Sequence, residues 1–192
     1  MSIKIDSRTD ALIVVDVQRD FCPGGALPVP EGDQVVPVIN RVLGLASWLS
    51  VATRDWHPPD HCSFKARGGI WPVHCVAETS GAAFHPGLDA KKMRRIVSKA
   101  TMKQAEAYSG FQGTELAGFL KGRGIRRVFV CGLATDYCVK ATALDAKRAG
   151  FDVIILEDAI RGVEVHPGDC RKAVEEMQAA GIGSTKTTDL AV

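Results

Sequence analysis

Cysteine is sparse in this chain, with six residues in 192. That density is too low for the disulfide framework of a small secreted domain. The first ten residues, MSIKIDSRTD, carry alternating charges, and the apolar stretch of a secretory signal is missing. We therefore expect free thiols and a cytoplasmic protein.

Long hydrophobic runs and basic stripes are also missing. Apolar stretches such as Val153–Leu156 have the length of a strand, far below the roughly 20 residues that cross a bilayer, so we expect no membrane partner. The formal net charge is only +2, and the basic cluster at 91–95 has no interleaved aromatic residues. That pattern disfavours nucleic-acid binding and favours a solvated face. No linker, repeat or low-complexity segment divides the chain, and its length suits one domain over 1–192.

Strand-length apolar segments rich in Val and Ile recur along the chain. They alternate little between polar and apolar residues, which is typical of strands covered on both faces. The predicted strands are 11–17, 49–56, 95–99, 127–133, 152–157 and, more weakly, 183–190.

Helical patterns lie between these strands, at 35–45, 114–123, 135–149 and 167–180. Gly124, Gly150 and Gly181 follow the last three, at the position where a left-handed residue commonly ends a helix. Alternating strands and helices predict an α/β fold with three layers, α/β/α, around a mainly parallel sheet. The segment 55–92 breaks this alternation, and a loop of that length in a compact domain is usually functional.

Reactive side chains lie at, or just past, the carboxyl ends of four of the predicted strands. Asp16, Asp55 and Lys99 end the first three, and Cys138 lies just past the fourth. Ligands of open α/β sheets bind beyond the carboxyl ends of the strands. We therefore expect these four side chains to meet at one rim.

Cys138 is a candidate nucleophile. It lies in the first turn of the helix predicted to begin near Thr135 and Asp136, where unpaired N–H groups and the helix dipole favour a thiolate. The alternative is a buried small hydrophobic residue, which is the interpretation we keep for Cys131 in mid-strand.

Asp16 and Lys99 gain meaning only beside Cys138. Alone, an Asp after a strand is commonly a helix cap or an ion-pair partner, and a Lys is usually solvated. Together they would give a cysteine amide hydrolase a base for the thiol proton and a cation for the negative charge.

Asp55 and His57 indicate a metal site. Side chains at i and i+2 of an extended chain share a face, and Pro58 keeps His57 out of the helical region. His61, His74 and His85 compete for the third ligand. Imidazole with carboxylate suits Zn, Fe or Mn, while a structural zinc site that uses Cys62 and Cys75 is the alternative.

Five ordered segments resemble the nicotinamidases of the isochorismatase-like cysteine hydrolase superfamily. They are DVQRDFCPGGALPVPEGD at 16–33, TRDWHPPDHCSF at 53–64, WPVHCV at 71–76, KATMKQAEAYSGF at 99–111 and CGLATDYCVKATALDA at 131–146. The resemblance implies an isochorismatase-like α/β fold. It also implies an enzyme that deamidates nicotinamide to nicotinate and ammonia, with pyrazinamide as a further substrate.

The resemblance also implies a role for individual residues. Asp16 is the expected general base and later acid, Lys99 the supporting cation and Cys138 the nucleophile. The expected ligands of one divalent metal ion, Zn foremost with Fe or Mn as alternatives, are Asp55, His57 and His74. Ser63 would touch a metal-bound water.

The same resemblance describes a substrate pocket. Phe21, Trp71 and Tyr108 would surround the pyridine ring, with Leu133 and Ala134 as further contacts. The peptide bond between Leu133 and Ala134 would be cis, so that the N–H groups of Ala134 and Cys138 form an oxyanion hole.

The sequence is also compatible with two other functions. A related amidase acting on another small amide would carry a similar site, and a non-enzymatic metal- or thiol-binding protein would need Asp16 and Lys99 to be incidental. The chain is also compatible with a homo-oligomer.

Overall fold

The computed structural model describes residues 2–192 and contains a six-stranded parallel sheet with the strand order β4-β3-β2-β5-β6-β7. All five neighbouring pairs are parallel, as predicted. The strands are β2 (Asp10–Val15), β3 (Leu49–Asp55), β4 (Arg95–Lys99), β5 (Arg127–Leu133), β6 (Asp152–Arg161) and β7 (Gly183–Thr185).

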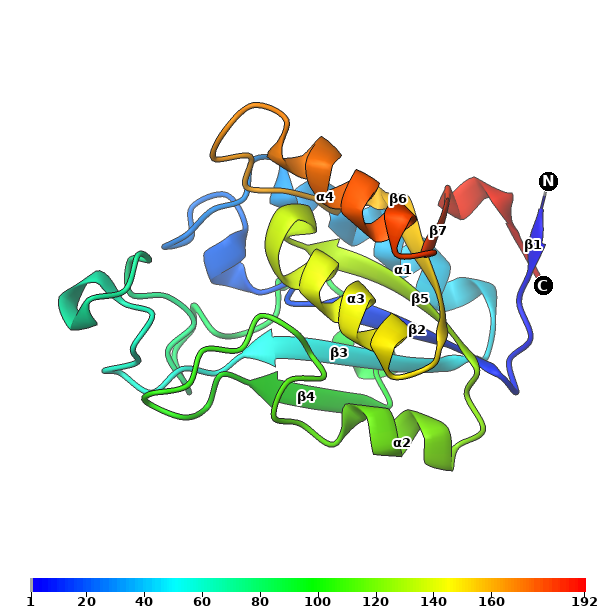
Figure 1. Ribbon diagram of the computed structural model, residues 1–192, viewed down its shortest axis with the longest axis horizontal. Coiled ribbons are helices and arrows are strands. Elements are labelled where there is room, and N and C mark those ends of the chain that lie inside the picture. The colour runs from blue at the N-terminus through cyan, green and yellow to red at the C-terminus, as the bar shows by residue number, and fades with distance from the viewer. Residues whose placement is uncertain (1) are drawn as a thin grey trace.

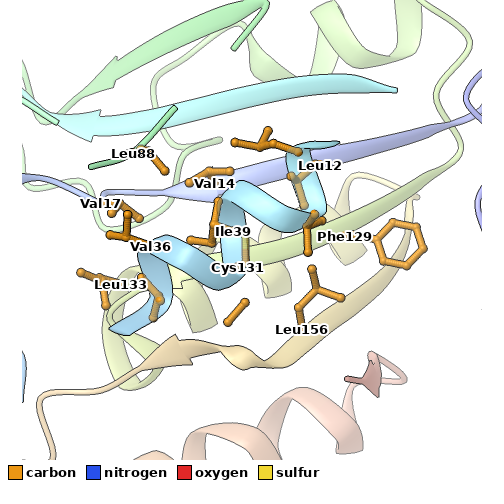
Figure 2. Close-up of a cluster of buried hydrophobic side chains, with 14 of the residues drawn as sticks. Leu12, Val14, Val17, Val36, Ile39, Leu88, Phe129, Cys131, Leu133 and Leu156 are labelled. Carbon is orange, nitrogen blue, oxygen red and sulfur yellow. The ribbon is translucent and has the colours of Figure 1, made fainter. Parts of the chain in front are cut away.

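Helices cover both faces of the sheet (Figure 1). One face packs on α1 (Val35–Leu45), and the other on α2 (Leu116–Gly122), α3 (Lys140–Arg148) and α4 (Asp169–Ala179). Side chains alternate across β2 accordingly: Leu12 and Val14 join the α1 side, while Ile13 joins the other. Figure 2 shows the α1 side, where Ile39 lies over Val14 and Cys131. The three-layer α/β/α prediction is confirmed.

Glycine ends the helices as the sequence predicts. Gly124, Gly150 and Gly181 all have positive φ. The predicted helix over 135–149 has a different start, because Thr135–Val139 forms a π-helical turn before α3 begins.

Two features of the strand pairing were not predicted. β6 runs four residues beyond Glu157, because its register with β5 shifts and pairing resumes at Gly132 and Ile160. The chain ends also pair, through a parallel contact of β1 (Ile3–Lys4) with β8 (Leu190–Ala191), and Figure 1 shows both ends side by side.

The remaining helical segments are single 3-10 turns. They are Arg19–Phe21, Gly32–Gln34, Lys65–Arg67, Ala90–Lys92 and Thr187–Asp189. Across residues 2–192, every helix is too short or too polar to cross a membrane.

The carboxyl ends of the strands share one end of the molecule. In Figure 1 the arrowheads of β3, β4 and β5 point toward the long loop that follows β3. This end therefore gathers the side chains that terminate or follow the strands.

Candidate active site

Asp16 follows β2 directly and is fully buried. Its backbone adopts a left-handed conformation with φ 49°, which is uncommon outside Gly and turns the side chain toward β3 and β4. Thr53 Oγ1 donates a hydrogen bond of 2.7 Å to Oδ1. Oδ2 forms a buried ion pair with Lys99 Nζ at 2.9 Å.

Lys99 ends β4 and connects the groups of the site. Its Nζ lies 2.5 Å from Asp55 Oδ1, donates to the carbonyl of Ala107 at 3.1 Å and lies 3.5 Å from Cys138 Sγ. Burial alone would lower the pKa of Lys99, but the carboxylates of Asp16 and Asp55 raise it well above its usual range. Lys99 is therefore a permanent cation within the site.

Cys138 lies in the π-helical turn and is 6% exposed. Its Sγ and carboxylate oxygens of Asp16 and Asp55 lie within 4.8 Å of one another. Burial raises the pKa of the Cys138 thiol well above its usual range, against the opposing effect of Lys99. Burial therefore opposes the effect expected of the helix terminus, and the thiol needs a base.

The pKa of the Asp16 carboxyl suits that base. Burial raises it above its usual range, although Lys99 opposes the shift. A carboxylate with a raised pKa is a stronger proton acceptor than an exposed one. Asp16 thus combines proximity to Sγ with an increased affinity for the proton.

Asp55, His57 and His74 form a buried group whose ligand atoms lie within 4.8 Å of one another. Nδ1 of His57 faces the carbonyl of Ala100 at 3.2 Å, and Nδ1 of His74 faces that of Pro72 at 2.8 Å. Such contacts commonly fix the tautomer of a metal-binding histidine and leave Nε2 free to coordinate.

This group fits a divalent cation. His57 Nε2 is buried, has no hydrogen-bond partner and lies 3.5 Å from Asp55 Oδ2. Burial lowers the pKa of His74, which keeps the imidazole neutral, as a ligand must be. Although burial opposes it, the charge of Lys99 is the main cause that holds the pKa of Asp55 below its usual range.

The other candidate ligands have different partners. Both ring nitrogens of His61 are engaged, Nδ1 with Ser63 Oγ at 2.7 Å and Nε2 with the carbonyl of Ala105 at 3.1 Å. Nδ1 of His85 accepts from the N–H of Gly87 at 3.1 Å. Of the three competing histidines, the structure joins His74 to Asp55 and His57.

A small cavity opens over these groups. Phe21, Trp71 and Tyr108 line it, as the resemblance implied, and Trp71 Nε1 donates to Tyr108 Oη at 2.9 Å. The reactive part of its wall consists of Asp55, His74, Ala134 and Cys138. The cavity therefore places an aromatic enclosure beside the nucleophile candidate and the metal-ligand group.

Four further wall residues were not predicted: Leu27, Val29, Tyr137 and Val163. Tyr137 precedes Cys138 in the same turn, a signal available in the sequence, while the other three reach the cavity only through the folding of distant loops. Leu133 does not line the cavity. Every second side chain of β5 points to the α1 side of the sheet. These side chains are Phe129, Cys131 and Leu133, and Leu133 is fully buried there (Figure 2).

The turn between β5 and Cys138 is tightly constrained. The peptide bond between Leu133 and Ala134 is cis, as the resemblance implied. Gly132 has φ 113° and lies against the backbone of Val15, leaving no space for a Cβ atom. The small residue at this position is thus a steric requirement.

The chain is similar in sequence to known proteins of one family. A family model described as the isochorismatase domain matches residues 10–189. The nicotinamidase of Escherichia coli (strain K12) is 40% identical over 198 residues, covering 89% of this chain and 92% of that protein.

Solved structures give the same result. The structure of PnC1 from L. infantum in complex with nicotinate has a TM-score of 0.95 and 40% identity, with 100% of this chain and 99% of that chain covered. The structure of the pyrazinamidase of Pyrococcus horikoshii in complex with zinc has a TM-score of 0.86 and 54% identity, with 92% and 98% covered. The six-stranded parallel sheet, its covering helices and the family match over residues 10–189 lead to one conclusion: the chain belongs to the isochorismatase family.

Proposed function

We propose that this chain is an amidohydrolase that converts nicotinamide to nicotinate and ammonia, and pyrazinamide to its acid, with Cys138 as nucleophile. One observation carries the proposal: Lys99 contacts Asp16, Asp55 and Cys138, and the last two line a cavity whose wall also holds four aromatic side chains. The 40% identity with a nicotinamidase over most of both chains supports the assignment.

The reaction begins with proton transfer. Asp16 Oδ2 takes the thiol proton as Sγ of Cys138 attacks the carboxamide carbon, and a tetrahedral adduct forms. During this step the negative charge moves from the Asp16 carboxylate to the sulfur of Cys138. The cation of Lys99 lies beside both groups and stabilises the charge at either position. Removing a general base of this kind typically slows a reaction by about 10²- to 10⁴-fold.

The adduct then breaks down and water completes the cycle. The N–H groups of Ala134 and Cys138 are proposed to bind the oxyanion, an interaction worth about 10²- to 10³-fold per donor. Protonated Asp16 donates its proton to the departing ammonia, leaving a thioester on Cys138. The regenerated carboxylate activates water, which cleaves the thioester to the acid and restores the thiol.

Asp55, His57 and His74 are proposed to hold one divalent metal ion, with zinc foremost. The buried, unpaired Nε2 of His57 and the donor set support this assignment, as does the zinc complex of the Pyrococcus horikoshii relative. When bound, the cation would supply a Lewis acid that holds the pyridine nitrogen of the substrate.

The cavity walls support a flat aromatic amide as substrate. Phe21, Trp71 and Tyr108 would enclose the ring, and the carboxamide would face Cys138. The nicotinate complex of the L. infantum relative supports the same class of ligand.

The test is ammonia and nicotinate release from nicotinamide by the purified protein. Chelator-treated protein should lose turnover, and single metals added back should restore it. Measuring the bound metal by elemental analysis in parallel separates loss of metal from loss of fold. Metal-replete protein that releases neither product would refute the proposal.

A further inference from the structure

The side chain of Gln18 binds the backbone of Asp55, one of the three proposed metal ligands. Gln18 lies two positions after Asp16 and is fully buried. Its Oε1 accepts a hydrogen bond of 2.8 Å from the N–H of Asp55, while Nε2 donates to the carbonyl of Asp55 at 2.8 Å and to that of Ala82 at 2.9 Å. Both donors of the side-chain amide are therefore used, and both lie in the interior.

These contacts replace a missing strand partner. β2 and β3 pair only as far as Val14 with Ala52, because the chain turns at Asp16, whose φ is 49°. On its other side β3 continues, with Asp55 paired to Lys99 of β4. Without Gln18, the N–H and carbonyl of Asp55 would face the interior unpaired on the β2 side, a costly state for backbone groups.

The amide can bind in only one orientation. Its NH₂ group faces two carbonyl oxygens and its oxygen faces an N–H group. Exchanging the two would oppose like with like. Gln18 therefore fixes the backbone of Asp55 in direction as well as in position.

The side-chain carboxylate of Asp55 has a different partner for each of its two oxygens. Oδ1 of Asp55 lies 2.5 Å from Lys99 Nζ, and Oδ2 lies 3.5 Å from His57 Nε2. A small rotation of the residue would favour one contact at the expense of the other. The position of Asp55 thus decides whether Oδ2 stays with the two histidines.

We infer that Gln18 is a positioning residue that holds Asp55 in register for metal binding. The inference rests on the proposed metal site. Gln18 and Asp16 lie in one tight turn, in which the N–H of Gln18 donates to the carbonyl of Asp16 at 2.8 Å. This turn therefore holds both the proposed base, Asp16, and the residue that supports the metal ligand Asp55.

Asn40 provides a matched control. Its Nδ2 donates to the carbonyl of Gly87 at 2.7 Å, and its Oδ1 accepts from the N–H of Asp89 at 2.8 Å. It therefore fastens the end of the same long loop with the same chemistry, away from Asp55, His57 and His74. Loss of either amide should loosen the loop, but only the loss of Gln18 should disturb Asp55.

The experiment compares the wild type with Gln18→Met, Gln18→Asn and Asn40→Leu after metal removal. The Kd for Co²⁺ is measured by competition with a chromophoric chelator, and the d–d absorption of the bound ion reports its ligand geometry. Circular dichroism confirms that each variant is folded, and Gln18→Asn serves if Gln18→Met does not fold.

The wild type should bind Co²⁺ stoichiometrically. Outer partners of ligands typically contribute about 10- to 100-fold to metal affinity, so the Gln18 variants should bind that much more weakly, with a changed d–d spectrum. Asn40→Leu should keep the wild-type affinity and spectrum. The inference is overturned if a folded Gln18 variant matches the wild type, or if Asn40→Leu weakens binding as much. A wild type that binds no Co²⁺ rejects the proposed metal site itself, and is recognised before any variant is compared.

Discussion

The ammonium nitrogen of Lys99 lies 2.9 Å from Oδ2 of Asp16, and neither side chain is exposed to solvent. Asp55 Oδ1 occupies a second side of the same cation. One buried positive charge thus serves two carboxylates, which leaves the site with a formal deficit of positive charge before the thiol ionises. The charges of Asp16 and Asp55 add to the effect of burial, which is the main cause of the raised pKa of the Cys138 thiol. Asp55 likewise adds to the effect of burial on the pKa of the Asp16 carboxyl.

Lys99→Met should destabilise the protein strongly and abolish turnover. Removing one partner of a buried ion pair typically costs about 3–5 kcal/mol, because the remaining charges stay uncompensated. Urea denaturation measures the change in the free energy of unfolding. Lys140→Met, which removes a surface pair with Glu176, is the control and should cost at most about 1 kcal/mol. Equal losses in the two variants would contradict the assignment.

Asp16→Asn should separate thiol ionisation from catalysis. The Asp16 carboxylate adds to the raised pKa of the Cys138 thiol, which burial chiefly causes and Lys99 opposes. Removing that negative charge lowers the pKa, so the pH midpoint for alkylation of Cys138, followed by peptide mass spectrometry, should move down. Turnover should nevertheless fall by about 10²- to 10⁴-fold, because the base is lost. An upward shift of the midpoint, or turnover at the wild-type level, would show that Asp16 acts otherwise.

Trp71→Phe should raise KM for nicotinamide with little effect on kcat. The change keeps an aromatic wall but removes the hydrogen bond from Nε1 to Tyr108 Oη. A net value of about 1 kcal/mol for such a bond corresponds to roughly fivefold in KM. Trp48→Phe is the control, since the buried Nε1 of Trp48 has no partner and the residue precedes β3 at the opposite end of the sheet. A kcat effect alone would argue against a binding role for Trp71.

Asp136→Asn should also raise KM. The carboxylate accepts from the N–H groups of Val163 at 2.9 Å and Glu164 at 2.8 Å, and Val163 lines the cavity. An amide can accept only one of these bonds and turns its NH₂ toward the other donor. Asp158→Asn is the comparison, because Asp158 accepts from the N–H of Thr187 away from the cavity. Both variants should lose stability in urea denaturation, and only Asp136→Asn should change KM.

Much of the fold was predictable because its signals are local. The apolar run Arg95–Lys99 and the run Arg127–Leu133 form β4 and β5 with the predicted bounds. Gly124 ends its helix because only a residue tolerant of positive φ fits there. The β1–β8 pair could not be predicted, because two-residue strands carry no periodicity and their partners are distant in sequence.

Part of the candidate site could also be predicted from the sequence, and part of it could not. Asp16, Asp55, Lys99 and Cys138 could be placed together because each ends or follows a parallel strand, and the structure brings them into contact. The choice of His74 over His61 came from the resemblance, since spacing alone does not define a loop. The burial that raises the pKa of Cys138, and the direction of Leu133 into the core, depend on packing that no local pattern reports.

The role of Cys138 as nucleophile is tested most directly by measuring ammonia release from nicotinamide by metal-replete Cys138→Ala beside Cys131→Ala. Both replace a buried free thiol by the same side chain, but only Cys138 contacts Lys99 and lines the cavity. We expect Cys138→Ala to lose turnover by more than about 10³-fold, in line with the loss of an essential nucleophile, and Cys131→Ala to stay close to the wild type. Turnover by Cys138→Ala comparable to that of Cys131→Ala would contradict the thioester mechanism.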